Sequence, residues 1–294
     1  MKELVVVSGK GGTGKTSVVA SFAALARDAV LADCDVDAAD LHLILAPEIT
    51  RREEFMSGHT AVVRQPDCIR CGACLAHCRF EAVIMSGREA GEAVFTIDPI
   101  ACEGCGVCVE FCPQKAIDFP ERHCGEWFVS ATRFGSMVHA RLGTGSANSG
   151  QLVSLVRKEA KRIAQERGIS IILVDGPPGI GCPVIASVTG ATTVLAVTEP
   201  TLSGEHDLGR VLGLARHFGV RALVCVNKWD INPGMTDKIE QEAADAGAMT
   251  VGRIPYDSAV TRAQVEGITV VEYGDGPAAN EIKRVWKEAC RMTS

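Results

Sequence analysis

Short apolar runs alternate along the chain with longer segments in which apolar residues recur every three or four positions. The runs are the length of buried strands and are too short for helices. Strands that are apolar on both faces are typical of parallel sheets covered by helices. The strand candidates are residues 4–7, 29–32, 169–174, 193–197, 222–226 and 250–254.

The longer segments have the periodicity of amphipathic helices. After the first run, for example, Val18, Val19, Phe22 and Leu25 fall on one helical face. Strands that alternate with helices predict an α/β fold with a doubly wound, mainly parallel sheet. The other helix candidates are residues 151–167, 203–218, 235–246, 258–265 and 277–292.

Two stretches give weaker signals. Residues 39–64 begin with a helical pattern and then become polar and irregular. Short strands are expected at 126–129 and 137–142, where they would either extend the sheet or form a hairpin.

Composition and charge narrow the classes of function. The chain has 294 residues, is 47% hydrophobic and carries a formal net charge of −6, so it can bury a substantial core. The acidic balance argues against a broad basic surface, and no nucleic-acid partner is expected. Met1 lies almost directly before the first strand, and no apolar run reaches the roughly 18 residues of a membrane span. We therefore expect a cytoplasmic protein with no stable membrane insertion.

A glycine-rich segment joins the first strand to the first helix. Its glycines allow backbone N–H groups to converge on phosphate oxygens, and the helix N-terminus adds the positive end of its dipole. Lys15 is expected to reach the β- and γ-phosphates of ATP, and the Thr16 hydroxyl to bind Mg²⁺. The residues expected to bind nucleotide here are Gly9, Lys10, Gly11, Gly12, Thr13, Gly14, Lys15, Thr16 and Ser17.

The same segment carries an additional lysine, Lys10, directly after Gly9. The pattern Lys-Gly-Gly-Thr-Gly-Lys-Thr resembles the deviant Walker A motif of the MinD/Mrp/ParA and nitrogenase iron protein superfamily, which shares the CobQ/CobB/MinD/ParA nucleotide-binding domain. This resemblance implies an ATPase that forms a homodimer with ATP sandwiched between the subunits. In that dimer Lys10 would reach the nucleotide of the facing subunit, and a partner protein would stimulate hydrolysis.

Carboxylates follow two of the predicted strands. The resemblance implies that Asp35 orients the attacking water, with Asp33 or Asp37 supporting Mg²⁺ or the loop. It also implies that Asp175 holds the Mg²⁺ shell and that Gly179 senses the γ-phosphate through its N–H group. The catalytic candidates are therefore Lys10, Lys15, Asp35 and Asp175; Asn227 and Pro255 are the positions expected to contact adenine.

Eight of the 13 cysteines form two runs with the spacing C-x2-C-x2-C-x3-C, and the second run begins 34 residues after the first. In a reducing compartment such spacing indicates metal binding rather than disulfides. Zinc is the alternative to iron–sulfur clusters, but zinc sites usually use two separated pairs. The candidate metal ligands are Cys68, Cys71, Cys74 and Cys78 in the first run, and Cys102, Cys105, Cys108 and Cys112 in the second.

The two runs resemble a bacterial two-cluster ferredoxin. This implies two 4Fe–4S clusters, in which each compact triplet binds one cluster and the fourth cysteine of each run binds the other. Cys112 would thus join the first triplet and Cys78 the second. Arg79 stands where the second run has Pro113, which puts the geometry of that turn in doubt. The predicted domains are a small α+β ferredoxin-like insertion at 64–121 and an ATPase domain at 1–63 and 122–294.

The leading hypothesis is an ATPase that couples ATP to electron transfer, or to metal-cofactor assembly, on a client protein. The alternatives are an iron–sulfur cluster carrier or scaffold, and a positioning ATPase of the MinD or ParA type with the clusters as redox sensors. Cys182 is either a buried core residue or, like a cysteine at the same offset in the nitrogenase iron protein, a ligand shared across the dimer, with Cys124 as the nearest second ligand. The amphipathic segment 277–292 either packs on the sheet or touches a membrane.

Overall fold

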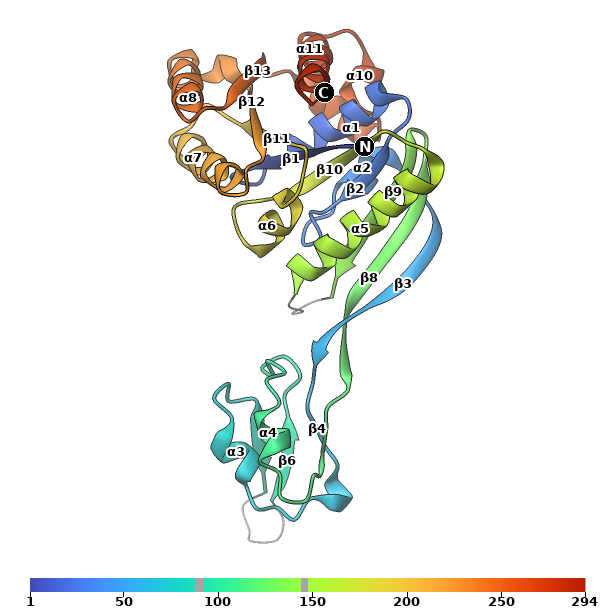
Figure 1. Ribbon diagram of the computed structural model, residues 1–294, viewed down its shortest axis with the longest axis vertical. Helices are drawn as coiled ribbons and strands as arrows, with labels where there is room; N and C mark the ends of the chain where they lie inside the picture. The colour runs from blue at the N-terminus through green and yellow to red at the C-terminus, as the bar shows by residue number, and fades with distance from the viewer. Residues whose placement is uncertain (88–92, 144–147, 294) are drawn as a thin grey trace. The chain divides into compact units, whose positions relative to one another are not determined.

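A computed structural model describes residues 1–87, 93–143 and 148–293. The chain forms two compact units (Figure 1). The smaller unit begins earlier and ends later than the predicted insertion at 64–121. The larger unit comprises Met1–Glu53, Glu126–Leu142 and Ser149–Ser294, and the smaller one comprises Glu54–Gly125 and Gly143–Asn148.

A nine-stranded sheet is the centre of the larger unit, with the order β13-β12-β11-β1-β10-β2-β9-β8-β3. The seven strands from β13 to β9 pair in parallel, which confirms the predicted mainly parallel sheet. The strands are β1 (Lys2–Ser8), β2 (Val30–Asp33), β3 (Glu48–His59), β8 (Glu121–Thr132), β9 (Gly135–Leu142), β10 (Ile171–Pro178), β11 (Thr193–Thr198), β12 (Arg221–Asn227) and β13 (Met249–Ile254).

The weak-signal stretches contain most of the differences from the prediction. Residues 48–59 form the long strand β3 instead of an irregular segment. Most side chains of β3 are exposed, so no apolar period marks it in the sequence. Strand β8 is also longer than the expected strand at 126–129, and β8 and β9 extend the sheet.

Helices cover both faces of the sheet (Figure 1). Alternate residues of β1 point to opposite faces, so Leu4 and Val6 belong to the core under α1 while Val5 and Val7 point the other way. The helices are α1 (Lys15–Ala26), α2 (Leu41–Leu45), α5 (Ser149–Arg167), α6 (Cys182–Val188), α7 (Leu202–His217), α8 (Pro233–Asp245), α9 (Ser258–Val265), α10 (Val270–Tyr273) and α11 (Pro277–Met292), with a 3₁₀ turn at Trp229–Ile231.

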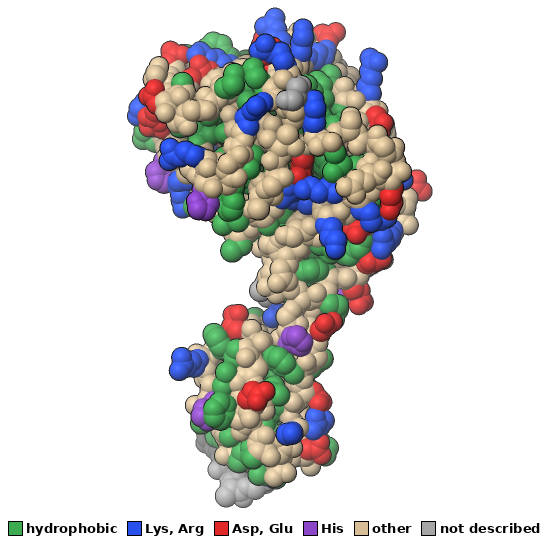
Figure 2. All heavy atoms as spheres, viewed as in Figure 1, with side chains coloured by type: hydrophobic (Ala, Val, Ile, Leu, Met, Phe, Trp, Pro, Cys, Tyr) green, Lys and Arg blue, Asp and Glu red, His purple; other side chains and the backbone are tan. Residues whose placement is uncertain are grey.

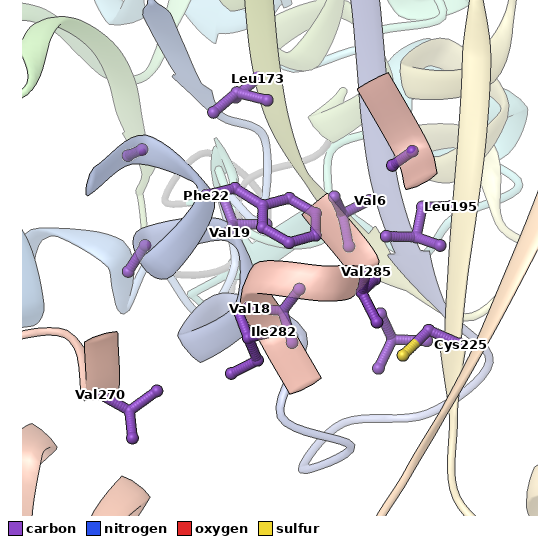
Figure 3. Close-up of a cluster of buried hydrophobic side chains, with 14 of the residues drawn as sticks. Val6, Val18, Val19, Phe22, Leu173, Leu195, Cys225, Val270, Ile282 and Val285 are labelled. Carbon is purple, nitrogen blue, oxygen red and sulfur yellow. The ribbon is translucent and has the colours of Figure 1, made fainter. Parts of the chain in front are cut away.

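The last helix, α11, packs against the sheet and α1. Figure 3 shows Ile282 and Val285 of α11 among the side chains of α1, where Phe22 lies with its ring centroid 5.0 Å from that of Trp286. The apolar face of α11 is therefore buried, as the packing interpretation of this segment predicts. Charged side chains of both signs are scattered over the visible face of the larger unit (Figure 2). None of the helices in the described residues is both long and apolar enough to cross a membrane.

In its described residues, the smaller unit has two short antiparallel sheets and two short helices, together with the end of β3 and the start of β8. One sheet pairs β5 (Val83–Ser86) with β6 (Val94–Ile97), and the other pairs β4 (Val62–Val63) with β7 (Ile117–Asp118). The helices are α3 (Ala73–His77) and α4 (Val107–Glu110), and a 3₁₀ turn spans Gln65–Asp67.

Candidate functional site

The glycine-rich loop lies at the carboxyl end of β1, directly before α1. Gly12 and Gly14 have φ values of 79° and 86°, in the left-handed region that favours glycine. No atom lies within 4 Å of where a Cβ of Gly11 or Gly12 would be, so this side of the loop is open to a ligand. The loop borders a pocket of about 570 Å³, lined by Ser8, Gly11, Gly12, Thr13, Gly14, Lys15, Thr16, Ser17, Asp35, Ala38, Asp40, Leu43, Ile44, Pro178 and Gln264.

Contacts from distant segments hold the loop in place. The Nδ2 atom of Asn227, at the end of β12, donates to the carbonyl oxygen of Thr13 over 2.7 Å. The Nζ atom of Lys228 donates to the carbonyl oxygen of Gly12 over 3.2 Å. A Cβ on Gly14 would collide with Asn227, so the close approach of this amide requires glycine there.

Lys15 is surrounded by carboxylates in the free chain. Its Nζ atom lies 2.5 Å from Oδ1 of Asp175 and 3.5 Å from Oδ2 of Asp35. Burial alone would lower the pKa of Lys15, but the charges of these aspartates raise it above its usual value, so the side chain is a cation. To reach a phosphate, Lys15 has to exchange Asp175 for the new anion.

Asp33 and Asp175 lie side by side because β2 and β10 are adjacent parallel strands with these two residues in register. Each has one buried carboxylate oxygen, Oδ2, without a hydrogen-bond partner. Burial, followed by the charge of Asp175, raises the pKa of Asp33 well above its usual value. Buried carboxylate oxygens without partners suit a hard cation, so these residues fit a Mg²⁺ ion bound next to Thr16.

Three other residues predicted to contact nucleotide do not line the pocket. The N–H group of Gly179 donates to the carbonyl oxygen of Ser8 over 2.9 Å. Asn227 braces the loop, and Pro255 is not among the residues that line the pocket. Their contacts with nucleotide stay predictions. Gln264 was not predicted at all, yet it lines the pocket and its Nε2 atom donates to Oγ of Ser17 over 2.8 Å.

Lys10 does not line the pocket. Its side chain lies against the segment that joins β11 to α7, where its Nζ atom is 2.5 Å from Oε1 of Glu199. Nothing in the spacing of the sequence marks Glu199 as a partner of the loop. Gly9 is packed so closely on Asp207 of α7 that a Cβ there would overlap the aspartate side chain.

The eight cysteines of the two runs line two pockets in the smaller unit. Each pocket contains one triplet and the fourth cysteine of the other run, so the runs cross over. The first pocket contains Cys68, Cys71, Cys74 and Cys112. The second contains Cys78, Cys102, Cys105 and Cys108.

The backbone has the same conformation at matching positions of the two runs. Three pairs have left-handed φ values, namely Arg70 and Gly104, Gly72 and Gly106, and Glu81 and Lys115. The last pair shows that the turn keeps this conformation although Arg79 replaces the proline of the second run. Gly104 has a further constraint, because a Cβ would overlap the carbonyl oxygen of His59.

Backbone N–H groups point at the fourth cysteine of each run. The N–H group of Ala116 donates to Sγ of Cys112 over 3.3 Å. Burial alone would raise the pKa of Cys78, but N–H groups of residues 80–83 lower it. Cysteine-lined pockets with N–H donors aimed at sulfur have the donor chemistry that a 4Fe–4S cluster requires, and the presence of such clusters stays a prediction. Within the described residues no three His, Cys, Asp or Glu side chains form a site for a single metal ion; a 4Fe–4S cube differs in binding each thiolate through a separate iron.

The remaining cysteines lie outside these pockets. Cys34, Cys124 and Cys225 are buried, and burial raises the pKa of Cys225 to about 12. Cys182 is exposed at the first turn of α6, so its interpretation as a buried core residue is wrong. Its role as a ligand stays a prediction.

A glycine-rich loop that opens a helix at the carboxyl edge of a mainly parallel sheet, with carboxylates around its lysine, defines a P-loop nucleotide-binding protein. The family model described as the CobQ/CobB/MinD/ParA nucleotide-binding domain matches residues 4–270. The chain therefore belongs to this family, whose MinD and ParA members are P-loop ATPases.

Three relatives illustrate the range of similarity. An uncharacterized protein of Methanocaldococcus jannaschii is 37% identical over 233 residues, which are 78% of this chain and 79% of that protein. An iron–sulfur cluster carrier protein of Pyrococcus abyssi is 26% identical over 46% of this chain and 50% of its own length. The septum site-determining protein MinD of Pyrococcus horikoshii, solved with Mg-ADP, has a TM-score of 0.59 at 17% identity and covers 100% of this chain and 97% of its own. This last match shows the fold alone.

Proposed function

We propose that this protein is a dimeric, iron–sulfur ATPase that couples ATP binding and hydrolysis to electron transfer, or to metal-cofactor assembly, on a client protein. The observation that carries this proposal is the presence of two cysteine-lined pockets in a chain that also has the P-loop of a MinD-type ATPase. The crossed cysteine sets are those that the ferredoxin resemblance implies.

The nucleotide would occupy the pocket beside the P-loop. The open backbone of Gly11 and Gly12 would bind the phosphates, and Lys15 would leave Asp175 for them. Thr16 and Asp175 would hold Mg²⁺, which would neutralise phosphate charge. Asp35, whose Oδ2 atom already lies near Lys15, would orient the attacking water. Catalysis of this kind depends mainly on positioning and electrostatic stabilisation.

The eight pocket cysteines would hold two 4Fe–4S clusters, which when bound would supply one-electron redox chemistry. The chain would contribute the thiolates and the backbone N–H groups directed at sulfur, such as that of Ala116. Apolar side chains such as Phe80, Phe111 and Ile100 are exposed on this unit and would be available to a client protein.

A cluster carrier is the second candidate function, and the similarity to the Pyrococcus abyssi carrier protein supports it. A carrier must release its clusters to an acceptor, whereas an electron-transfer protein keeps them through many cycles. The two functions therefore differ in whether iron leaves the chain during turnover.

An anaerobic redox titration followed by EPR, with and without Mg-ATP, tests the proposal. We expect about eight iron and eight sulfide per chain and a change of potential or signal when Mg-ATP is added. Lys15→Met should keep the iron and lose the response to nucleotide. Cys124→Ser is the matched cysteine control, because Cys124 is buried outside both pockets and should not affect iron content.

The outcomes separate the functions. Absence of iron after anaerobic reconstitution would refute the iron–sulfur proposal. A full iron content with no response to ATP would refute the coupling. Loss of iron to an apo-ferredoxin acceptor, promoted by ATP, would favour the carrier.

A further inference from the structure

The ammonium group of Lys10 is fully engaged within its own subunit. Its Nζ atom contacts Oε1 of Glu199 at 2.5 Å, Oγ of Ser203 at 3.2 Å and Oγ1 of Thr201 at 3.4 Å. Glu199 and Thr201 belong to the segment that joins β11 to α7, and Ser203 lies in the first turn of α7. A lysine has three N–H donors, so these contacts leave none for a phosphate. Lys10 can act on another subunit only after giving them up.

Glu199 has a second cation. Its Oε2 atom lies 3.1 Å from Nζ of Lys228, which also donates to the carbonyl oxygen of Gly12. The side chain of Glu199 is only 15% exposed, so leaving it without a partner would be unfavourable. Because Lys228 remains when Lys10 departs, the carboxylate never becomes unpaired.

Burial alone would raise the pKa of Glu199, but hydrogen bonds from Lys10 and Lys228 lower it. The group is therefore an anion at neutral pH and binds both lysines by charge-assisted hydrogen bonds. Such bonds are roughly twice as strong as those to a neutral acceptor.

We propose that Glu199 is a positioning residue that holds Lys10 in the free subunit and releases it when two nucleotide-bound subunits pair. This inference rests on the proposed ATP-sandwich dimer and adds the group that opposes its formation. Lys228 keeps Glu199 paired in both states. Lys10 can therefore leave and return without leaving the carboxylate unpaired.

The size of the effect follows from the symmetry of the dimer. Each subunit must release one Lys10, so the effect on the dimer dissociation constant is the product of two equal factors. If a neutral acceptor weakens each contact by about threefold, the dissociation constant falls by about tenfold, equivalent to about 1.4 kcal/mol.

The test compares Glu199→Gln with Glu205→Gln in the full chain. Glu205 is a matched control, because it lies on α7 and pairs with Lys238 over 2.7 Å, away from Lys10. Self-association is measured by sedimentation velocity at saturating Mg-AMP-PNP. We expect Glu199→Gln to dimerise about tenfold more tightly than wild type and Glu205→Gln to match wild type.

A second variant separates the holding of Lys10 from the bracing of the loop. In Lys228→Met, release of Lys10 would leave Glu199 without a cation, so dimerisation should weaken. If Lys228→Met tightened dimerisation as Glu199→Gln does, the effect would come from the contact with Gly12 and the inference would be wrong.

Lysine acylation of the nucleotide-free protein, quantified by mass spectrometry, gives a readout that needs no dimer. Lys10 should react about threefold faster in Glu199→Gln than in wild type, and an unchanged rate would refute the inference. If wild type dimerises with nucleotide but Glu199→Gln gains nothing, only this inference fails. If neither protein dimerises, the proposed ATP-sandwich dimer fails with it.

Discussion

Replacing Asn227 by alanine tests how the nucleotide pocket is built. The amide of Asn227 makes two hydrogen bonds in the free chain: Nδ2 donates to the carbonyl oxygen of Thr13 over 2.7 Å, and Oδ1 accepts from the N–H group of Lys228 over 3.0 Å. Asn227 also fills the space beside Gly14. The amide therefore has one N–H and one lone pair of its oxygen left for a base.

The expected loss follows from these two bonds. Each contributes about 0.5–1.5 kcal/mol net, so their removal costs about 2 kcal/mol. Without these bonds the free loop would be less ordered. Nucleotide binding would then have to supply this free energy to order the loop. A loss of about 2 kcal/mol corresponds to roughly thirtyfold weaker binding. Because the loop is expected to contact the phosphates and not the base, ATP and GTP should lose affinity equally.

Titration calorimetry with ATP and GTP provides the assay. Asn232→Ala is the matched control: Asn232 caps α8 by accepting from the N–H group of Met235 over 3.1 Å and does not line the pocket. This control should lose about 1 kcal/mol of folding stability and keep its nucleotide affinity. A loss for ATP but not for GTP in Asn227→Ala would refute the bracing argument and support the predicted adenine contact.

Three further results are expected. In Cys112→Ser and Cys78→Ser, iron should fall from about eight to about four per chain, with a different EPR signal lost in each variant; loss of the same signal in both would refute the crossed ligand sets. Lys15→Met should weaken ATP binding by at least about a hundredfold, since a charge-assisted bond to each of two phosphates is removed; calorimetry showing unchanged affinity would contradict this. Burial lowers the pKa of His139 to about 4, whereas the unfolded chain takes up its proton near 6.5, so stability from this residue is present at pH 7 and falls by about 2 kcal/mol by pH 5. Between pH 7 and pH 5 the folding stability of His139→Gln, measured by urea unfolding, should therefore fall by about 2 kcal/mol less than that of wild type. An equal fall in both proteins would be inconsistent with a neutral buried histidine.

The parallel part of the fold could be predicted because its signals are local. Strands such as β1, β10 and β11 are buried on both faces, so they appear in the sequence as continuous apolar runs. Strand β3 could not be predicted in this way. Its side chains are mostly exposed, and its pairing partner β8 lies more than sixty residues away in the sequence.

The same distinction between local and long-range signals applies to the residues of the candidate sites. The glycine-rich loop and the cysteine spacing of the smaller unit are properties of a few consecutive residues, so the sequence alone is enough to single them out. Glu199, Asp207 and Gln264 reach the loop or its pocket only because parallel strands and their helices bring distant segments to one edge of the sheet. No local pattern distinguishes them from other polar residues.

A sequence motif also does not show which groups each lysine contacts in the free chain. The motif predicts that Lys10 and Lys15 bind phosphate, but a buried or half-buried ammonium needs an anion before any nucleotide arrives. Asp175 serves Lys15, and Glu199 serves Lys10. On the proposed function, nucleotide binding would consequently be an exchange of anions around two existing cations. The affinity for ATP would then depend on how tightly the carboxylates hold those lysines as well as on the phosphate contacts themselves. A residue outside the pocket lining, such as Lys228, could therefore change the affinity for nucleotide by altering the contacts that Lys10 gives up.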